Sequence, residues 1–184
     1  MRGAGLESGE EEAARVACLE QLEARGVRDR DIAALVHELQ RRYVPGLSVE
    51  ECLEAVHAVL AKREVHNALM TGIALDRLAE AGTLPEPLGS ILMRDDPLYG
   101  IDEVLALAVV NIYGSIGLTN FGYLDKVKPG VVGEVDRAGH GPGQCNTFLD
   151  DLIAAVAAAA AARLAHRHRD IALRAHPAAV DPGP

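Results

Sequence analysis

Apolar residues recur at helical spacing along most of the chain, the pattern expected for one buried face of an α-helix. The segments that carry this spacing are 10–24, 29–43, 48–60, 62–82 and 85–93. Ser48 is followed three residues later by Glu51, a capping box that marks the start of a helix. No segment alternates cleanly between apolar and polar residues, so the sequence predicts an all-α protein.

Two further segments, Val104–Val110 and Leu152–Ala162, are apolar on nearly every helical face. Helices of that kind belong at the centre of a bundle. A chain of 184 residues suits one domain with a sizeable core. We therefore predict a single-domain multihelical bundle over 10–176 with two central apolar helices, between flexible tails at 1–9 and 177–184.

Glycine-rich stretches separate these apolar segments. Tyr113–Gly122 and Val127–Asn146 are both predicted to be loops, the second with a short extended piece at Val131–Val132. Thr147 and Asp150 resemble a capping box with Asp in the usual Glu position, which predicts a long final helix from Thr147 to about Ala175.

Composition and net charge limit the classes of partner and the cell compartment that the sequence suggests. The formal charge is −9, which argues against a general nucleic-acid-binding surface. Three isolated cysteines without a pairing pattern favour a reducing cytoplasm. The longest uninterrupted apolar run, Leu152–Ala162, is shorter than the roughly 20 residues that span a membrane. No transmembrane segment is predicted.

Each predicted central helix carries two adjacent carboxylates at its N-terminal end, Asp102 with Glu103 and Asp150 with Asp151. The connection between them is long enough for the helices to pack parallel, which would bring four acids together. Clustered carboxylates need a counter-charge, and Mg²⁺, with Mn²⁺ as an alternative, supplies one. Asp96 precedes the first pair and is a further candidate ligand. The alternative is that these acids only cap helix N-termini.

Other polar residues are candidates for phosphate binding. The glycine-rich stretch offers backbone N–H groups at Gly114 and Gly117, but no GK[ST] sequence of a Walker A loop follows. The remaining candidates are Thr119, Asn120, Lys126, Glu64 and Asn67, the last two on one face of a predicted helix. Lys128 is the alternative to Lys126 as the charge partner of a phosphate. A helix end with a turn explains the glycines equally well, and a solvated helix face is the common setting for Glu64 and Asn67.

Three strings of this sequence resemble the phosphatidylglycerophosphatase A family, in particular its small soluble YutG-type bacterial branch. They are KREVHNALMTGIALD, DDPLYGIDEVLALAVVNIYGSIGLTNFGYLDKVKPG and HGPGQCNTFLDDLIAAVAAAAAARLAHR. The resemblance covers about Gly26 to His166. Its DP…DE and late DD segments correspond to Asp96-Pro97, Asp102-Glu103 and Asp150-Asp151 here, and Gly114, Gly117 and Asn120 fall in the glycine-rich segment.

The resemblance implies an all-helical fold and Mg²⁺-dependent hydrolysis of phosphatidylglycerophosphate to phosphatidylglycerol, a step of phospholipid biosynthesis. In membrane-embedded members the glycine-rich segment precedes the acidic residues, whereas here it follows them. We expect a cytoplasmic phosphatase at the inner face of the membrane, in which Asp102, Glu103, Asp150 and Asp151 are catalytic. Homo-oligomerisation is expected from the alanine-rich helix. A non-catalytic helical oligomer and a phosphohydrolase of nucleotide or sugar phosphates are the alternatives.

Overall fold

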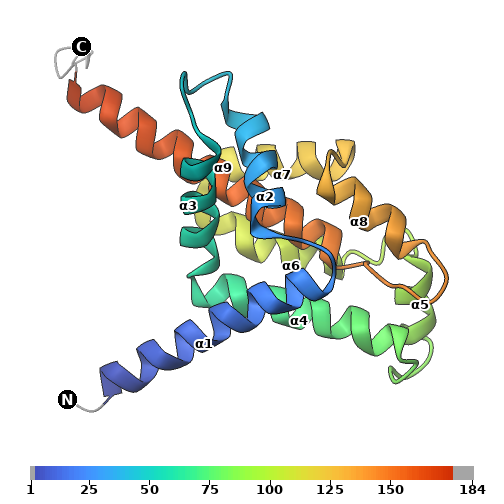
Figure 1. Cartoon of the computed structure of the whole chain (residues 1–184). Helices are drawn as coiled ribbons and strands as arrows, with labels where there is room; N and C mark the ends of the chain where they lie inside the picture. The colour runs from blue at the N-terminus through green and yellow to red at the C-terminus, as the bar shows by residue number, and fades with distance from the viewer. Residues whose placement is uncertain (1–2, 176–184) are drawn as a thin grey trace, which may run out of the picture.

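The computed structural model describes residues 3–175, all of whose regular structure is helical (Figure 1). The helices are α1 Gly3–Ala24, α2 Asp29–Gln40, α3 Val49–Leu60, α4 Arg63–Glu80, α5 Leu88–Arg94, α6 Ile101–Val110, the 3-10 helix η1 Asn111–Tyr113, α7 Gly114–Val127, α8 Val131–Gly139 and α9 Leu149–Ala175. The predicted all-α class is confirmed. The capping box is present at Ser48, whose hydroxyl accepts the backbone N–H of Glu51.

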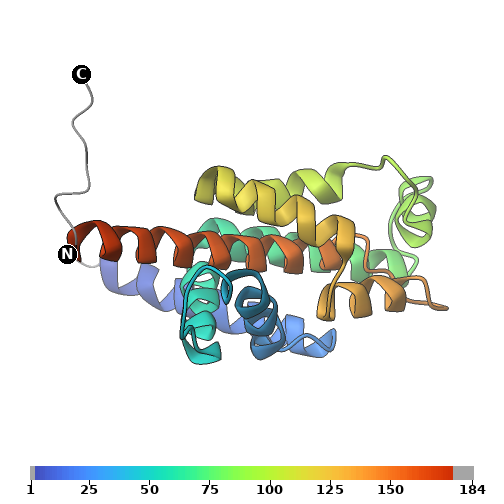
Figure 2. The ribbon, with the colours of Figure 1, turned by 90° about the horizontal axis from the view of Figure 1, so that it is seen from above.

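Helix α9 forms the centre of the bundle. Every side chain from Leu149 to Ala162 is at most 5% exposed, because α2, α3, α4, α6, α7 and α8 all pack against it. Figure 2 shows α9 running through the molecule with other helices above and below it. A run of alanines lets neighbouring helices approach closely and costs no side-chain entropy in the helix.

The predicted loop at Tyr113–Gly122 is wrong, since this stretch ends η1 and begins α7. The chain reverses direction at Gly114, whose φ of +69° is a conformation open to glycine. Gly117 then lies against the end of α6, where an added Cβ would stand 3.1 Å from Val110 Cγ1. The glycines therefore serve a sharp turn and a close helix–helix contact.

The second predicted loop, Val127–Asn146, also contains a helix, α8, in place of an extended piece at Val131–Val132. Val131, Val132 and Val135 are buried, a helical spacing that the glycines around them obscured. At the N-terminus, α1 already begins at Gly3, within the predicted tail. Residues 1–2 and the predicted C-terminal tail at 177–184 lie outside the described residues.

Helix α6 is covered on one side only. Ala106, Val109 and Val110 are buried, whereas Ile101 and Val104 are 52% and 59% exposed. The expectation of burial on every face therefore holds for α9 and not for α6. By length and composition one described stretch, Ile101–Val127, is apolar enough to cross a membrane, and 28% of its apolar window is buried. It folds as two helices joined by a reversal, not as one rod.

Candidate functional site: an acidic cavity

A cavity of about 270 Å³ collects seven carboxylates from four parts of the chain. We call it the acidic cavity. The carboxylates lining it are Asp95, Asp96, Asp102, Glu103, Asp125, Asp150 and Asp151. Among the described residues that line it, Lys128 is the one with a cationic side chain. Both acidic pairs singled out in the sequence thus reach the same place.

The directions of three helices explain this convergence. Helices α6 and α9 pack together with their N-terminal ends at the cavity, and α7 returns with its C-terminal end there (Figure 2). In one straight helix Asp102 and Asp125 would lie about 35 Å apart, yet both line this cavity. The reversal at Gly114 is therefore what places Asp125 and Lys128 beside the acids.

The backbone around the cavity is unusual. Asp95, Leu98 and Lys128 are the non-glycine residues with positive φ in the described chain, at +48°, +67° and +46°. All three line the acidic cavity. Such conformations are disfavoured for residues with a Cβ and tend to cluster at functional sites, where the surrounding structure holds them.

Lys128 links two of the surrounding helices through its ammonium group. Its Nζ donates to Asp136 Oδ1 at 2.5 Å and to Asp150 Oδ2 at 2.7 Å. Although partial burial opposes the charged form of Lys128, these two carboxylates outweigh it and raise the pKa of the ammonium. Lys128 is therefore cationic at neutral pH and offsets part of the local negative charge.

Burial and mutual repulsion raise the pKa values of several carboxyl groups in the acidic cavity. Asp150 and Asp151 are each 5% exposed. Burial raises the pKa of Asp150 to about 6 even though Lys128 opposes this. The pKa of Asp151 is also raised, first by burial and then by the charges of Asp150, Asp125 and Asp102. Burial likewise raises the pKa of Asp95. One lysine does not neutralise this cluster.

A buried aspartate of α4 fixes the start of α9 next to the acidic cavity. Asp76 of α4 is fully buried and accepts the backbone N–H groups of Phe148 and Leu149 at 3.2 and 3.1 Å. The predicted Thr147 cap is wrong in this respect, because the Thr147 hydroxyl donates to the Leu92 carbonyl at 2.7 Å. Asp76 therefore supplies the N-terminal cap from another helix, which holds the following two aspartates in position.

A second anchor holds the segment just before α9. Glu80 accepts the backbone N–H of Cys145 at 2.9 Å and pairs with Arg25 at 2.7 Å. Arg25 also donates to the Cys145 carbonyl and to the Asn146 side chain. These contacts tie α1, α4 and the segment before α9 together.

The donor set fits a hard divalent cation. Carboxylate oxygens are the ligands that Mg²⁺ prefers, and a bound divalent cation would offset the burial and the like-charge repulsion that raise the pKa values of Asp150 and Asp151. Asp102 Oδ1 is buried without a hydrogen-bond partner. Asp95 of the cavity also belongs to a group with Asp136 and His140, in which each residue offers a ligand atom within 4.8 Å of the others. Asp96 fits less well, since its carboxylate already pairs with Arg94 at 2.6 Å.

Several predicted phosphate-binding residues lie elsewhere. Gly114, Gly117, Thr119 and Asn120 belong to the half of α7 remote from the acidic cavity, and the last two line a different cavity. Lys126 is exposed and is not among the lining residues of the acidic cavity.

Glu64 and Asn67 are exposed at the start of α4. The charge of Glu64 acts on Tyr113, at the far end of α6. Neither residue is among the lining residues of the acidic cavity.

Sequence reasoning missed Asp125 and Asp136 as members of the site and chose Lys126 over Lys128. No periodic pattern marks them, because the reversal at Gly114 and the helix α8 bring them in. The string Asp125-Lys126-Val127-Lys128-Pro129-Gly130 held one usable signal: a lysine before Pro-Gly ends a helix, and its backbone conformation then directs the side chain.

Comparison with known proteins identifies the family to which this chain belongs. The family model for phosphatidylglycerophosphatase A matches residues 31–166. This protein belongs to that family. The uncharacterized proteins YpjQ and YutG of Bacillus subtilis are each 54% identical to it, over 83% and 81% of this chain and 84% and 89% of their own lengths.

Solved structures agree with the fold of this phosphatidylglycerophosphatase A family member. The crystal structure of Bacillus subtilis YpjQ superposes with a TM-score of 0.82 at 51% identity, covering 88% of this chain and 98% of that one. The low temperature requirement C protein of Listeria monocytogenes gives a TM-score of 0.82 at 51% identity, covering 86% and 98%. The predicted YutG-type branch is confirmed.

Proposed function

We propose that the protein is a divalent-metal-dependent phosphatase that hydrolyses the phosphomonoester of phosphatidylglycerophosphate, with the acidic cavity as its active site. The observation that carries the proposal is the meeting of Asp102, Asp150 and Asp151 in one cavity, from helices far apart in the chain. The family description supports the reaction class.

Different residues of the chain would bind the metal, attract the phosphate and hold the site in position. Asp95, Asp102, Asp150 and Asp151 would hold Mg²⁺ or Mn²⁺, with Glu103 and Asp125 also lining the cavity. The ion would polarise a phosphoryl oxygen and make a bound water more acidic. Lys128 offers positive charge beside Asp150, which favours the approach of a phosphate to a cavity otherwise lined by carboxylates. Asp76 keeps the N-terminus of α9 fixed.

Apolar residues next to the cavity favour a lipid over a water-soluble ester. Leu98 lines the cavity and its side chain is fully exposed. Ile101 and Val104 continue this exposed apolar surface along α6. A phosphate in the cavity would leave the attached diacylglycerol beside these side chains, consistent with action at the surface of a membrane.

The test measures phosphate release from detergent micelles of phosphatidylglycerophosphate, with Mg²⁺ and with EDTA. Asp150→Asn is expected to lower metal-dependent release by at least about 100-fold, while the circular dichroism spectrum remains helical. Glu54→Gln, an exposed acid on α3, is the matched control and should keep full activity. Unchanged release by Asp150→Asn would remove this residue from the site.

Two further measurements bear on the rival functions. Calorimetric titration with Mg²⁺ and Mn²⁺ should show a saturable site that Asp150→Asn weakens, and no such site would favour a non-catalytic bundle. A panel of sugar and nucleotide phosphates should be hydrolysed more slowly than the lipid. Faster release from a soluble ester would contradict the lipid assignment.

A further inference from the structure

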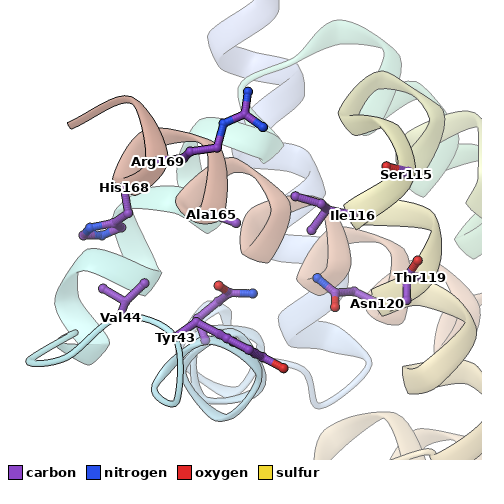
Figure 3. A pocket seen from close by; sticks show the side chains of 10 residues that line it. Tyr43, Val44, Ser115, Ile116, Thr119, Asn120, Ala165, His168 and Arg169 are labelled. Carbon is purple, nitrogen blue, oxygen red and sulfur yellow. The ribbon is translucent and has the colours of Figure 1, made fainter. Parts of the chain in front are cut away.

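A second, larger cavity lies at the other end of the bundle. Its volume is about 600 Å³, within the usual range of small-molecule sites. The end of α2, the first half of α7 and the last part of α9 enclose it (Figure 3). Ala165 in its wall is about 21 Å along α9 from Asp151 of the acidic cavity. The two cavities are separate.

The walls of this cavity are partly apolar. Val44, Ile116 and Ala165 contribute aliphatic groups, and Ile116 points into the space from α7. Tyr43 also lines the cavity, with its side chain 78% exposed. An exposed aromatic ring beside an aliphatic wall suits a flat, partly apolar ligand.

Two carboxamide side chains line the cavity, one from α2 and one from α7. Gln40 at the end of α2 is only 4% exposed, and its amide makes no hydrogen bond to another described residue. Asn120 of α7 points toward the cavity (Figure 3), and its Nδ2 is buried without a hydrogen-bond partner. A buried amide donor without a partner is costly, so an acceptor on a bound ligand would stabilise Asn120. The Gln40 amide offers the same ligand a second donor and an acceptor.

The charges of the second cavity are opposite to those of the first. Arg169 and His168 of α9 line it, and none of its lining residues that the structure describes is acidic. In a chain with a formal charge of −9, a cavity whose described lining includes Arg169 and no acidic residue points to an anionic ligand. Arginine is the side chain best shaped to bind a phosphate group.

We propose that this cavity binds a nucleoside monophosphate. The base would lie between Gln40 and Asn120, whose amides match the donor and acceptor pattern of a base edge. Tyr43 would contact the ring face, and Arg169 the phosphate. An acyl chain would fill the same volume but leave the buried Asn120 Nδ2 without a partner. This site does not depend on the proposed phosphatase function.

Calorimetric titration in EDTA tests this, because the proposed metal-dependent site is then inactive. The probes are AMP, GMP, CMP and UMP, with inorganic phosphate for comparison. At least one nucleotide should bind saturably and more tightly than phosphate. Arg169→Ala and Gln40→Leu should each weaken that binding by about tenfold or more. Arg167→Ala, an exposed arginine on the same helix that does not line the cavity, should leave it unchanged.

The acidic-cavity variant Asp150→Asn should bind the same nucleotide as the wild type does. Three results would overturn the proposal: no saturable binding of any of the four nucleotides, binding no tighter than that of phosphate, or binding that Asp150→Asn abolishes. Nucleotide affinity that is the same in Arg169→Ala, Gln40→Leu and the wild type would also place the ligand elsewhere.

Discussion

At the scale of the residue, membership of the acidic cavity depends more on where the fold places a side chain than on its residue type. Lys126 and Lys128 differ by two places in the sequence, yet only Lys128 lines the acidic cavity and bonds Asp136 and Asp150. The positive φ of Lys128 at the end of α7 directs its side chain inward. The acids Asp150 and Asp151 were predictable because adjacent carboxylates on an apolar helix are conspicuous, whereas Asp136 stands in an ordinary amphipathic segment.

Replacing Lys128 should separate its effects on metal and on phosphate. Lys128→Met removes a positive charge, so Mg²⁺ should bind more tightly while KM for the phosphate ester rises by about 10- to 100-fold. Calorimetry and steady-state kinetics measure the two quantities. Lys126→Met is the matched control and should change neither. Weaker Mg²⁺ binding in Lys128→Met would mean that the lysine mainly holds the structure together.

At the scale of the element, glycine has two opposite meanings that the sequence alone does not separate. Gly114 turns the chain and Gly117 permits close packing, so a stretch that resembles a loop is mostly helix α7. A capping box predicted a helix start correctly where both partners are close in sequence, as at Ser48 and Glu51. The cap of α9 could not be predicted, because it comes from Asp76 on α4.

Two glycine-to-alanine variants compare a helical glycine that close packing requires with one that it does not, by their effects on the free energy of unfolding. An added Cβ at Gly72 of α4 would lie 2.4 Å from Leu152 Cδ1 and 2.9 Å from Phe148 Cβ. Gly72→Ala should therefore destabilise the protein by about 1–3 kcal/mol, despite the higher helix propensity of alanine. Gly122→Ala on α7 meets nothing within 4 Å and should stabilise by roughly 0.5–1 kcal/mol. Urea unfolding decides, and a more stable Gly72→Ala would show that α4 and α9 pack less tightly.

At the scale of the whole molecule, burial in the bundle favours the protonated form of an acid that water would leave charged. Asp76 holds α9 in place, and burial raises its pKa to about 7 although its backbone hydrogen bonds and Arg25 oppose this. The folded protein therefore retains a proton that the unfolded chain has lost above the ordinary aspartate pKa. Stability from this group is complete below about pH 4 and is lost as the pH rises to about 7.

This predicts an acid-favoured contribution to stability in EDTA. Wild-type melting temperatures at pH 4.5 and 7.5 should differ more than those of Asp76→Asn, which keeps an acceptor oxygen for α9 but does not titrate. The difference between the two proteins isolates Asp76 from the other buried acids. Equal pH dependence in both would contradict the raised pKa of Asp76.

The sequence by itself determined the helical class, the central place of α9 and the pairing of acids at its N-terminal end. Periodicity, alanine content and adjacent charges are local properties, and they act within one or two helical turns. Only the tertiary structure decided which residues meet at and beside the acidic cavity. The reversal at Gly114 brings Asp125 and Lys128 to its lining, and the placement of α8 brings Asp136 to Lys128 beside it. Those contacts depend on helix directions, which the whole packed bundle sets and no single segment encodes.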